Sequence, residues 1–221
     1  MKYKTEMHCH TAECSKCSSI TSEEIIKKYI DAGYSSIVIT DHYGEKHFGK
    51  HGDVDETAYF FTGYKKAKAL ANGKIDVLCG MEICFPHYPQ NDYLVYGDVE
   101  KALFKNPEAY KLELPDFCDW AHENNLIVYQ AHPFRNGSTI VNPTPLDGIE
   151  VFNGLPRFDS RNSIAAAWAE YFNKKRISGS DAHRNEDIAR GGIITEIKIT
   201  NTNELLSILK NEAYTIIVQE K

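Results

Sequence analysis

The chain has 221 residues and a formal net charge of −6, from 25 basic and 31 acidic side chains. This length allows a core large enough to fold without disulfide bonds, and we expect a single domain over residues 1–221. A content of 42% hydrophobic and 25% charged residues argues against disordered, collagen-like and coiled-coil classes. The acidic balance also argues against duplex nucleic acid as a partner, because affinity for a duplex comes from neutralising its phosphates.

No apolar run approaches the roughly 18 residues of a membrane span, and residues 1–6 lack the apolar segment of a signal peptide. We therefore expect a cytoplasmic protein without membrane contact; the oligomeric state stays open. The six cysteines are expected to be free thiols in a reducing compartment. Cys14-x-x-Cys17 has no second pair of the same kind, so it is a weak signal for zinc or redox chemistry.

Short apolar strands alternate with helical stretches along the chain. In chain order, we expect strands at 3–9, 35–40, 74–85, 92–96, 126–131, 148–152, 176–180, 193–199 and 213–219. The expected helices cover 22–33, 55–72, 114–125, 159–175 and 202–211. This alternation predicts βα units and a mainly parallel sheet, either open and doubly wound or closed into a barrel. In both architectures functional side chains gather at the carboxyl ends of the strands.

Histidines and carboxylates mark these strand ends. Five of the nine histidines stand there, namely His8, His10, His42, His132 and His183. Three acids accompany them: Asp41, Glu82 and Asp181. Residues two apart in a strand share a face, so His8 and His10 point together while Cys9 turns towards the core.

So many ionisable groups in one crevice are costly unless a metal compensates them. Imidazoles combined with carboxylates suit Zn²⁺, Mn²⁺ or Fe²⁺. Their number exceeds what one tetrahedral ion needs and predicts two or three divalent ions, with Glu82 or Asp181 as a bridge.

Four ordered motifs also carry a family resemblance: His8-Cys9-His10, Ile39-Thr40-Asp41-His42, Ala131-His132-Pro133-Phe134-Arg135 and Gly179-Ser180-Asp181-Ala182-His183. With Gly80-Met81-Glu82 in between, the chain resembles the PHP (polymerase and histidinol phosphatase) family of metal-dependent phosphoesterases over about residues 5–185. The resemblance implies an α/β fold, a distorted (β/α)7 barrel, with a di- or trinuclear site at its carboxyl face. The implied ligands are His8, His10, His42, Glu82, His132, Asp181 and His183.

Two departures from the family pattern concern the third metal ion. Family members carry a further His or Asp five or six residues after the first motif, where this chain has Ser15 and Lys16, so Glu13 is the candidate substitute. Members with three metals also use a histidine after the strand that follows the bridging glutamate. Here Asp98 is the candidate, and His87 is a weaker one.

Other residues are singled out by their positions. Asp41 is expected to orient a ligating imidazole, and Glu150 to do the same or to contact substrate. Arg135 follows a ligand-bearing strand and Arg190 follows the last motif, so both are candidates to hold a substrate phosphate. We expect His47 and His51, in the loop 43–54, to be solvated rather than to close over a substrate.

Together these residues predict a hydrolase of phosphate esters, in which a metal-activated hydroxide attacks phosphorus and Arg135 neutralises charge on the equatorial oxygens. Asp181 or a ligand histidine is the candidate to protonate the leaving oxygen. The expected substrate is a small phosphorylated metabolite or nucleotide; a nuclease acting on oligonucleotide ends is one alternative. A non-catalytic metal-binding module is another. A third, an amidohydrolase acting on C–N bonds, is weakened because no lysine stands at a strand end.

Overall fold

The computed structural model describes residues 2–49 and 55–219. Its strands are β1 (Tyr3–Glu6), β2 (Ser36–Ile39), β3 (His42–Tyr43), β4 (Asp76–Phe85), β5 (Tyr88–Tyr96), β6 (Ile127–Gln130), β7 (Gly148–Asn153), β8 (Lys175–Gly179), β9 (Ile193–Thr195) and β10 (Thr215–Ile216). Its helices are α1 (Ser22–Asp31), α2 (Glu56–Ala71), α3 (Val99–Lys105), α4 (Leu114–Glu123), α5 (Asn162–Tyr171) and α6 (Thr202–Asn211).

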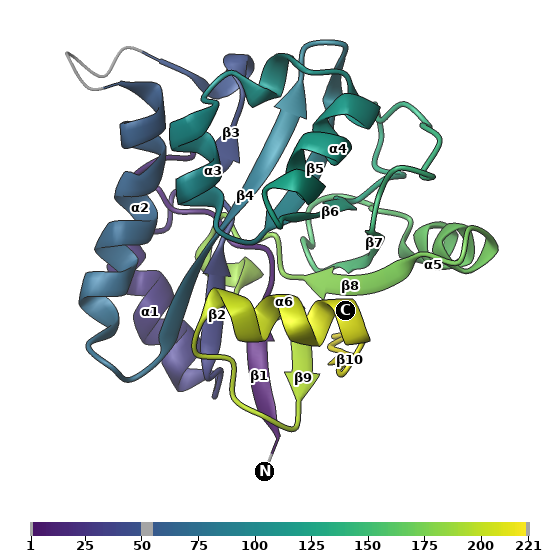
Figure 1. The fold of residues 1–221 in the computed structure, drawn as a ribbon. Coiled ribbons are helices and arrows are strands. Elements are labelled where there is room, and N and C mark those ends of the chain that lie inside the picture. Colours follow the sequence, from purple (N-terminus) through teal and green to yellow (C-terminus); the bar gives the residue numbers. More distant parts are fainter. Residues whose placement is uncertain (1, 50–54, 220–221) are drawn as a thin grey trace.

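The strands form one sheet in the order β10-β9-β1-β2-β4-β5-β6-β7-β8, with β3 paired beside β4 (Figure 1). The pairs β1–β2, β2–β4, β6–β7 and β7–β8 are parallel. Strand β5 runs antiparallel to both of its neighbours, and β9 runs antiparallel to β1. Strand β8, at one end of this series, comes back to β1, the third strand from the other end, where Cys9, beyond β1, pairs with Ala182, beyond β8. The sheet is therefore a nearly closed barrel.

The α/β class and the barrel-shaped sheet confirm the predicted fold. The number of seven βα units stays a prediction, because β5 follows β4 in a hairpin instead of after a helix. This hairpin decides where two candidate site residues lie. Since β5 is reversed, it begins at the rim where β4 ends and runs away from that rim, so that Tyr96 lies opposite Gly80 of β4 and Asp98 lies beyond it.

Local signals explain most of the element boundaries, with a few differences. Helix α1 begins with a capping box between Thr21 and Glu24. The helix predicted at 159–175 is shorter, because Arg161 and Asn173 adopt left-handed backbone conformations on either side of α5. Helix α3 is absent from the prediction, and the predicted strands 193–199 and 213–219 shrink to β9 and β10.

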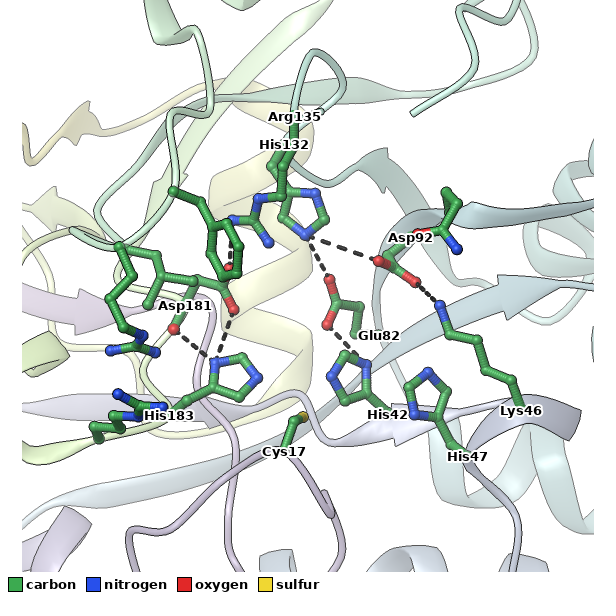
Figure 2. Close-up of a pocket in the computed structure, with 15 residues that line it drawn as sticks. Cys17, His42, Lys46, His47, Glu82, Asp92, His132, Arg135, Asp181 and His183 are labelled. Carbon is green, nitrogen blue, oxygen red and sulfur yellow. Dashed lines mark hydrogen bonds and ion pairs between the residues drawn. The ribbon is translucent and has the colours of Figure 1, made fainter. Parts of the chain in front are cut away.

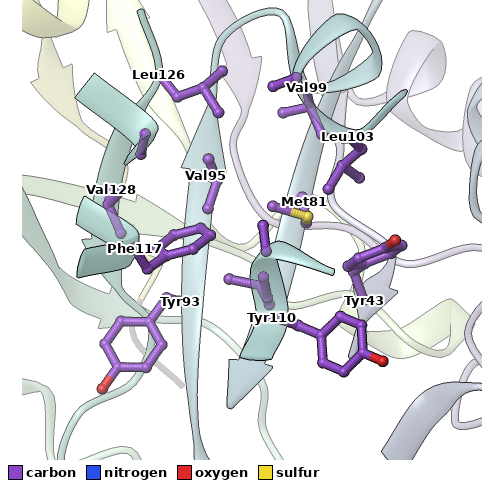
Figure 3. Packing of buried hydrophobic residues seen from close by; sticks show 14 of the residues in the cluster. Tyr43, Met81, Tyr93, Val95, Val99, Leu103, Tyr110, Phe117, Leu126 and Val128 are labelled. Carbon is purple, nitrogen blue, oxygen red and sulfur yellow. The ribbon is translucent and has the colours of Figure 1, made fainter. Parts of the chain in front are cut away.

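Two large apolar clusters pack against the sheet. One lies outside the β4–β5 hairpin, where Met81, Val95 and Phe117 are among the side chains packed under α3 and α4 (Figure 3). The other includes Met7 from the end of β1 and Leu205 of α6, so α6 packs across one end of the sheet (Figure 1). With that end covered by apolar packing, the polar strand termini are left at the opposite end.

Within residues 2–49 and 55–219, no helix combines the length and apolar character that crossing a bilayer requires. Cys9 packs among buried apolar side chains beside α1, as its place between His8 and His10 predicts. The cytoplasmic location stays a prediction.

Candidate metal centre

The seven predicted ligands meet at the polar end of the barrel. His8 and His10 follow β1, His132 follows β6, and Asp181 and His183 follow β8. The first residue of β3 is His42, which lies opposite Glu82 of β4 in the parallel pairing. Because each of these strands ends at the same rim, side chains more than 170 residues apart in sequence come into contact. Figure 2 shows Glu82 between His42 and His132, with Asp181 and His183 facing them.

Four overlapping groups of side chains place one ligand atom each within 4.8 Å of the others. They are His8–His10–Glu82–Asp181, His10–His42–His183, Glu82–Asp92–His132 and His42–His47–Asp92. The overlap means that His10, His42, Glu82 and Asp92 each belong to two groups. Such sharing is what a site for adjacent metal ions with bridging ligands requires.

Glu82 is the centre of this arrangement and is almost fully buried. Its Oε1 lies 3.3 Å from His8 Nε2 and 3.1 Å from His132 Nε2. Its Oε2 lies 3.1 Å from His10 Nε2 and 3.0 Å from His42 Nδ1. Four of these atoms still have no partner in hydrogen-bonding geometry within the described chain, namely His8 Nε2, His10 Nε2, His42 Nδ1 and Glu82 Oε2. Buried polar atoms left in this state are costly, and coordination to a cation satisfies them.

The electrostatics of the cluster also fit a cation. Burial opposes a charge on His8, but the carboxylates of Glu82 and Asp181 outweigh it and raise the pKa of His8 well above its ordinary value. Burial likewise opposes a charge on His10, but the nearby carboxylates of Asp181 and Glu82 outweigh it and raise the pKa of His10 to about 9. The acids compensate for their own burial by attracting positive charge. Protons supply that charge in the bare cluster, and divalent ions would replace them.

Two imidazoles stay neutral, which is the form that binds metals. Burial, reinforced by the positive charge of His10, lowers the pKa of His183 to about 3. Burial and the nearby His42 lower the pKa of His47 to about 2. A hydrogen bond between His183 Nδ1 and the backbone oxygen of Asp181, at 2.9 Å, leaves the other ring nitrogen of His183 available.

The backbone is strained where it presents two of the ligands. His132 has φ +27° and Asp181 has φ +53°, both in the left-handed region that side chains other than Gly, Asn and Asp rarely adopt. Gly179 allows a third close approach, because a Cβ at that position would lie 2.3 Å from His8 Cβ. Sequence periodicity cannot predict these local conformations, which aim the side chains at the common centre.

Glu150, in β7, orients ligands as expected. Its Oε1 lies 2.8 Å from His8 Nδ1, so the Nδ1 proton points at Glu150 and Nε2 faces Glu82. Its Oε2 accepts hydrogen bonds from the backbone N–H of His132 and from Asn153 Nδ2. One fully buried carboxylate thus positions two of the predicted ligands.

Asp41, which was expected to orient a ligating imidazole, does not contact one directly and reaches His10 through Ser15. The Asp41 carboxylate accepts hydrogen bonds from the backbone and hydroxyl of Thr11 and from Ser15 Oγ. The hydroxyl of Ser15 in turn lies 3.4 Å from His10 Nδ1 and accepts from the backbone N–H of His42. Asp41 therefore acts on His10 only through Ser15, since Thr11 and Ser15 occupy its oxygens.

Neither candidate for the third metal ion joins the cluster. Glu13 accepts from the backbone N–H of Ser22 and forms an ion pair with Lys66 at 2.8 Å. Asp98 accepts from the backbone N–H of Lys101 at the start of α3. It follows the end of β5, and because β5 is antiparallel to β4, that end lies away from Glu82. The weaker candidate His87 pairs with Glu113 at 2.9 Å, and both side chains are exposed.

The acid that does reach the site is Asp92. It lies in the middle of β5, opposite Cys84 of β4, with its Oδ2 4.0 Å from His132 Nε2. The usable sequence signal is the short separation between Phe85 and Asp92, which is typical of a hairpin. In a hairpin the second strand runs away from the rim where the first strand ends, so Asp92 lies nearer that rim than Asp98 does.

The predictions for the remaining loop residues have different outcomes. His47 is not solvated: its ring stacks on His42 with centroids 4.1 Å apart, and its buried Nε2 has no partner in the described chain. His51 lies outside the described residues. Cys17 lines the same pocket, whereas Cys14 is buried against α2, so the two thiols do not form one site.

The two arginines that were predicted to bind phosphate lie in different cavities. Arg135 lines the pocket, and its Nη2 donates to Asp181 Oδ2 at 2.7 Å and to Asn153 Oδ1 at 2.9 Å. Its Nε is buried and has no hydrogen-bond partner in the described chain. Arg190 lines a neighbouring cavity instead and donates to the backbone oxygen of Glu186. The structure therefore supports a phosphate contact for Arg135 and not for Arg190.

Comparison with known proteins agrees with this geometry. The family model for the PHP domain matches residues 6–219. The chain belongs to the PHP domain family. No curated protein is a significant match to the sequence.

Several solved structures share the fold. A two-domain protein from Bacteroides vulgatus that contains a predicted PHP-like metal-dependent phosphoesterase gives a TM-score of 0.71 at 16% identity, over 99% of this chain and 65% of that one. PsfC from Pseudomonas syringae gives 0.66 at 15% identity, over 93% and 88%. The lesion-specific endonuclease PfuEndoQ from Pyrococcus furiosus gives 0.64 at 16% identity, over 98% and 58%. The chain spans less than two thirds of the first and third of these proteins, and at such identities the likeness shows the fold alone.

Proposed function

We propose that this protein is a metal-dependent phosphoesterase that hydrolyses a small phosphorylated metabolite or nucleotide. The observation that carries the proposal is the buried Glu82 carboxylate, which faces ring nitrogens of four histidines at 3.0–3.3 Å beside the buried guanidinium of Arg135. His8, His10, His42, Glu82, His132, Asp181 and His183 would hold the divalent ions, with Asp92 and His47 as further donors. Ions bound there would stabilise negative charge and activate water for phosphoryl transfer.

The chain's own residues have three tasks in such a reaction. Arg135 binds non-bridging oxygens of the phosphate, because its guanidinium lines the pocket and its Nε–H is unused. Asp181 holds Arg135 in place through the 2.7 Å contact with its Nη2. Asp41, through Ser15, and Glu150 fix the imidazoles that surround the reacting atoms.

Asp181 is not suited to protonate the leaving oxygen. Burial alone would raise its pKa, but the charges of His8 and Arg135 outweigh it and hold the pKa well below its usual range. The carboxylate therefore stays ionised and is a better ligand than acid. A pocket histidine is the remaining candidate for the proton donor among the residues predicted for that role.

The test combines metal analysis with an activity screen on one preparation. Phosphomonoesters, nucleotides and short oligonucleotides would be assayed with Mn²⁺, Zn²⁺ and Fe²⁺, and bound metal would be counted by mass spectrometry. We expect two or three ions per chain and hydrolysis of small monoesters. His10→Ala and His183→Ala should lose both metal and turnover, whereas the matched control His87→Ala, outside the pocket, should keep both. Bound metal without turnover of any substrate would support the non-catalytic alternative, and cleavage of oligonucleotides alone would support the nuclease.

A further inference from the structure

The pocket over the metal cluster has room and charge beyond what one phosphate uses. Its volume is about 550 Å³, which is in the range of cavities that take drug-sized ligands. Four basic side chains line it: Lys46, Arg135, Arg157 and Arg184. The apolar side chains of Leu155 and Phe158 lie in the same wall, and the Phe158 ring is 5.2 Å from the Arg135 guanidinium.

The acids of the pocket do not balance this charge once metal is bound. The lining carboxylates are Glu82, Asp92 and Asp181, and all three belong to candidate metal-ligand groups. Two or three divalent ions would neutralise them and leave Lys46, Arg135 and Arg184 in excess, while Arg157 is paired with the buried Asp187 outside the pocket lining. A phosphate monoester carries a charge of roughly −1.5 to −2 at neutral pH, so one such group does not compensate the whole pocket.

The four basic residues divide into two pairs. Lys46 forms an ion pair with Asp92 at 3.2 Å and Arg135 forms one with Asp181 at 2.7 Å, so both attach to acids of the metal cluster. Arg157 and Arg184 contact no acid that lines the pocket. For the exposed Arg184 guanidinium, no ion pair forms within residues 2–49 and 55–219. This second pair is free of the metal cluster.

A buried carboxylate fixes the second pair at the pocket wall. Asp187 is fully buried, and its Oδ1 accepts from Arg157 Nη1 at 2.5 Å. Its Oδ2 accepts from the backbone N–H groups of His183 and Arg184 at 3.0 and 2.8 Å. Asp187 therefore holds the guanidinium of Arg157, and only the backbone of Arg184, at the turn that carries the last predicted metal ligand. Glu186 lies 3.7 Å from Arg157, but its side chain is 58% exposed, so solvent and salt weaken this competing pair.

We propose that Arg157 and Arg184 form a second anion-binding subsite, and that the substrate is a small phosphate ester whose leaving group carries another carboxylate or phosphate. The inference rests on the phosphoesterase function proposed above. The scissile phosphate lies at the metal cluster with Arg135, and the second anion lies at Arg157 and Arg184. Leu155 and Phe158 contact the carbon skeleton that joins the two groups.

The test uses matched pairs of substrates that differ by one anionic group. Fructose 1,6-bisphosphate is compared with fructose 6-phosphate, and 3-phosphoglycerate with glycerol 3-phosphate. We expect kcat/KM to be about tenfold or more higher for the two-anion member of at least one pair, as charge-assisted contacts of this kind are worth. The first pair reports on phosphate as the second anion and the second pair on carboxylate.

Arg184→Gln should lower kcat/KM about tenfold more for the preferred two-anion substrate than for its one-anion partner, mainly through KM. Arg157→Lys keeps a charge next to the buried Asp187 but loses the two-pronged guanidinium, so it should reduce the same preference while the protein stays folded. The control Arg176→Gln removes an equal charge from an exposed residue of β8 outside the pocket, and should keep the ratio of the intact protein.

Equal kcat/KM within both pairs, or a preference that survives in both variants, would overturn the subsite. If metal-loaded protein hydrolyses no probe, the phosphoesterase proposal fails, and calorimetric binding of the same pairs decides the subsite by itself. Binding of the two-anion member about tenfold more tightly, lost in Arg184→Gln, would support the subsite in that case, and equal binding would refute it.

Discussion

Replacing Glu150 by glutamine tests how this buried carboxylate, which contacts His8 and His132, controls metal binding. In the native protein Glu150 Oε1 accepts a hydrogen bond from His8 Nδ1–H. Its Oε2 accepts hydrogen bonds from the backbone N–H of His132 and from Asn153 Nδ2, at 3.0 and 2.9 Å. A glutamine has only one acceptor oxygen. If that oxygen keeps the two N–H donors, the amide nitrogen faces His8 Nδ1 and drives His8 to the tautomer with its proton on Nε2. If the amide turns over, two buried N–H groups lose their acceptor.

The first outcome removes His8 Nε2 as a ligand and the second displaces His132, so both weaken metal binding. Loss of such an orienting partner typically costs 10–100-fold in metal affinity, which corresponds to ~1.4–2.7 kcal/mol. Calorimetric titration of chelator-stripped protein with Mn²⁺ measures this directly. Glu170→Gln is the matched control, because Glu170 is exposed on α5. A Glu150→Gln variant that binds Mn²⁺ within twofold of the native protein and keeps its turnover would refute this account of Glu150.

Three further predictions concern the ligand set and its protons. Asp92→Ala should weaken metal binding and lower turnover at least about tenfold. Asp98→Ala should keep both, and should lower the free energy of unfolding by about 0.5–2 kcal/mol because α3 loses its N-terminal cap. Equal losses of metal binding and turnover in the two variants would make Asp98 a ligand candidate again. Chelation should abolish phosphoesterase activity and lower Tm. Mn²⁺ at 100 times its Kd should then raise the free energy of unfolding by about 2.7 kcal/mol. A Tm that does not change on chelation would contradict a metal site in this cluster. Burial opposes the His10 charge, but the neighbouring carboxylates raise its pKa from 6.5 to about 9, so its stabilisation of the metal-free fold is complete below pH 6.5 and is lost as the pH rises through 9. Over the same window Mn²⁺ affinity should rise by about tenfold per pH unit for each proton released, and a flat profile in calorimetry would show that His10 is not protonated.

The sequence was sufficient for the ligands whose position follows from strand direction. His8, His10, Glu82 and Asp181 stand at ends of apolar strands, and in a parallel arrangement such ends share one rim. The same logic found Glu150, because β7 is parallel to both β6 and β8. For these residues, periodicity and alternation already contain the spatial information.

The assignments that were wrong depend on strand reversal and on side-chain competition. Asp98 was the candidate because the family pattern has a ligand after the strand that follows the bridging glutamate, and the reversal of β5 brings Asp92 to the site instead. Glu13 is occupied by Lys66 and by the start of α1, a competition between partners that no spacing reveals. His47 reaches the site only because a short 3-10 turn stacks it on His42.

The sequence by itself determined the class of fold and the identity of most side chains in the candidate metal site, because residue types and strand-end positions are local properties. Only the tertiary structure decided which acids join the cluster, how Glu150 and Asp41 support it, and which arginines stand free at the pocket wall. Those features depend on pairs such as Asp187 with Arg157 and Asp181 with Arg135. Such pairs form between distant segments that the closed sheet brings together, and their distances follow from packing instead of from order along the chain.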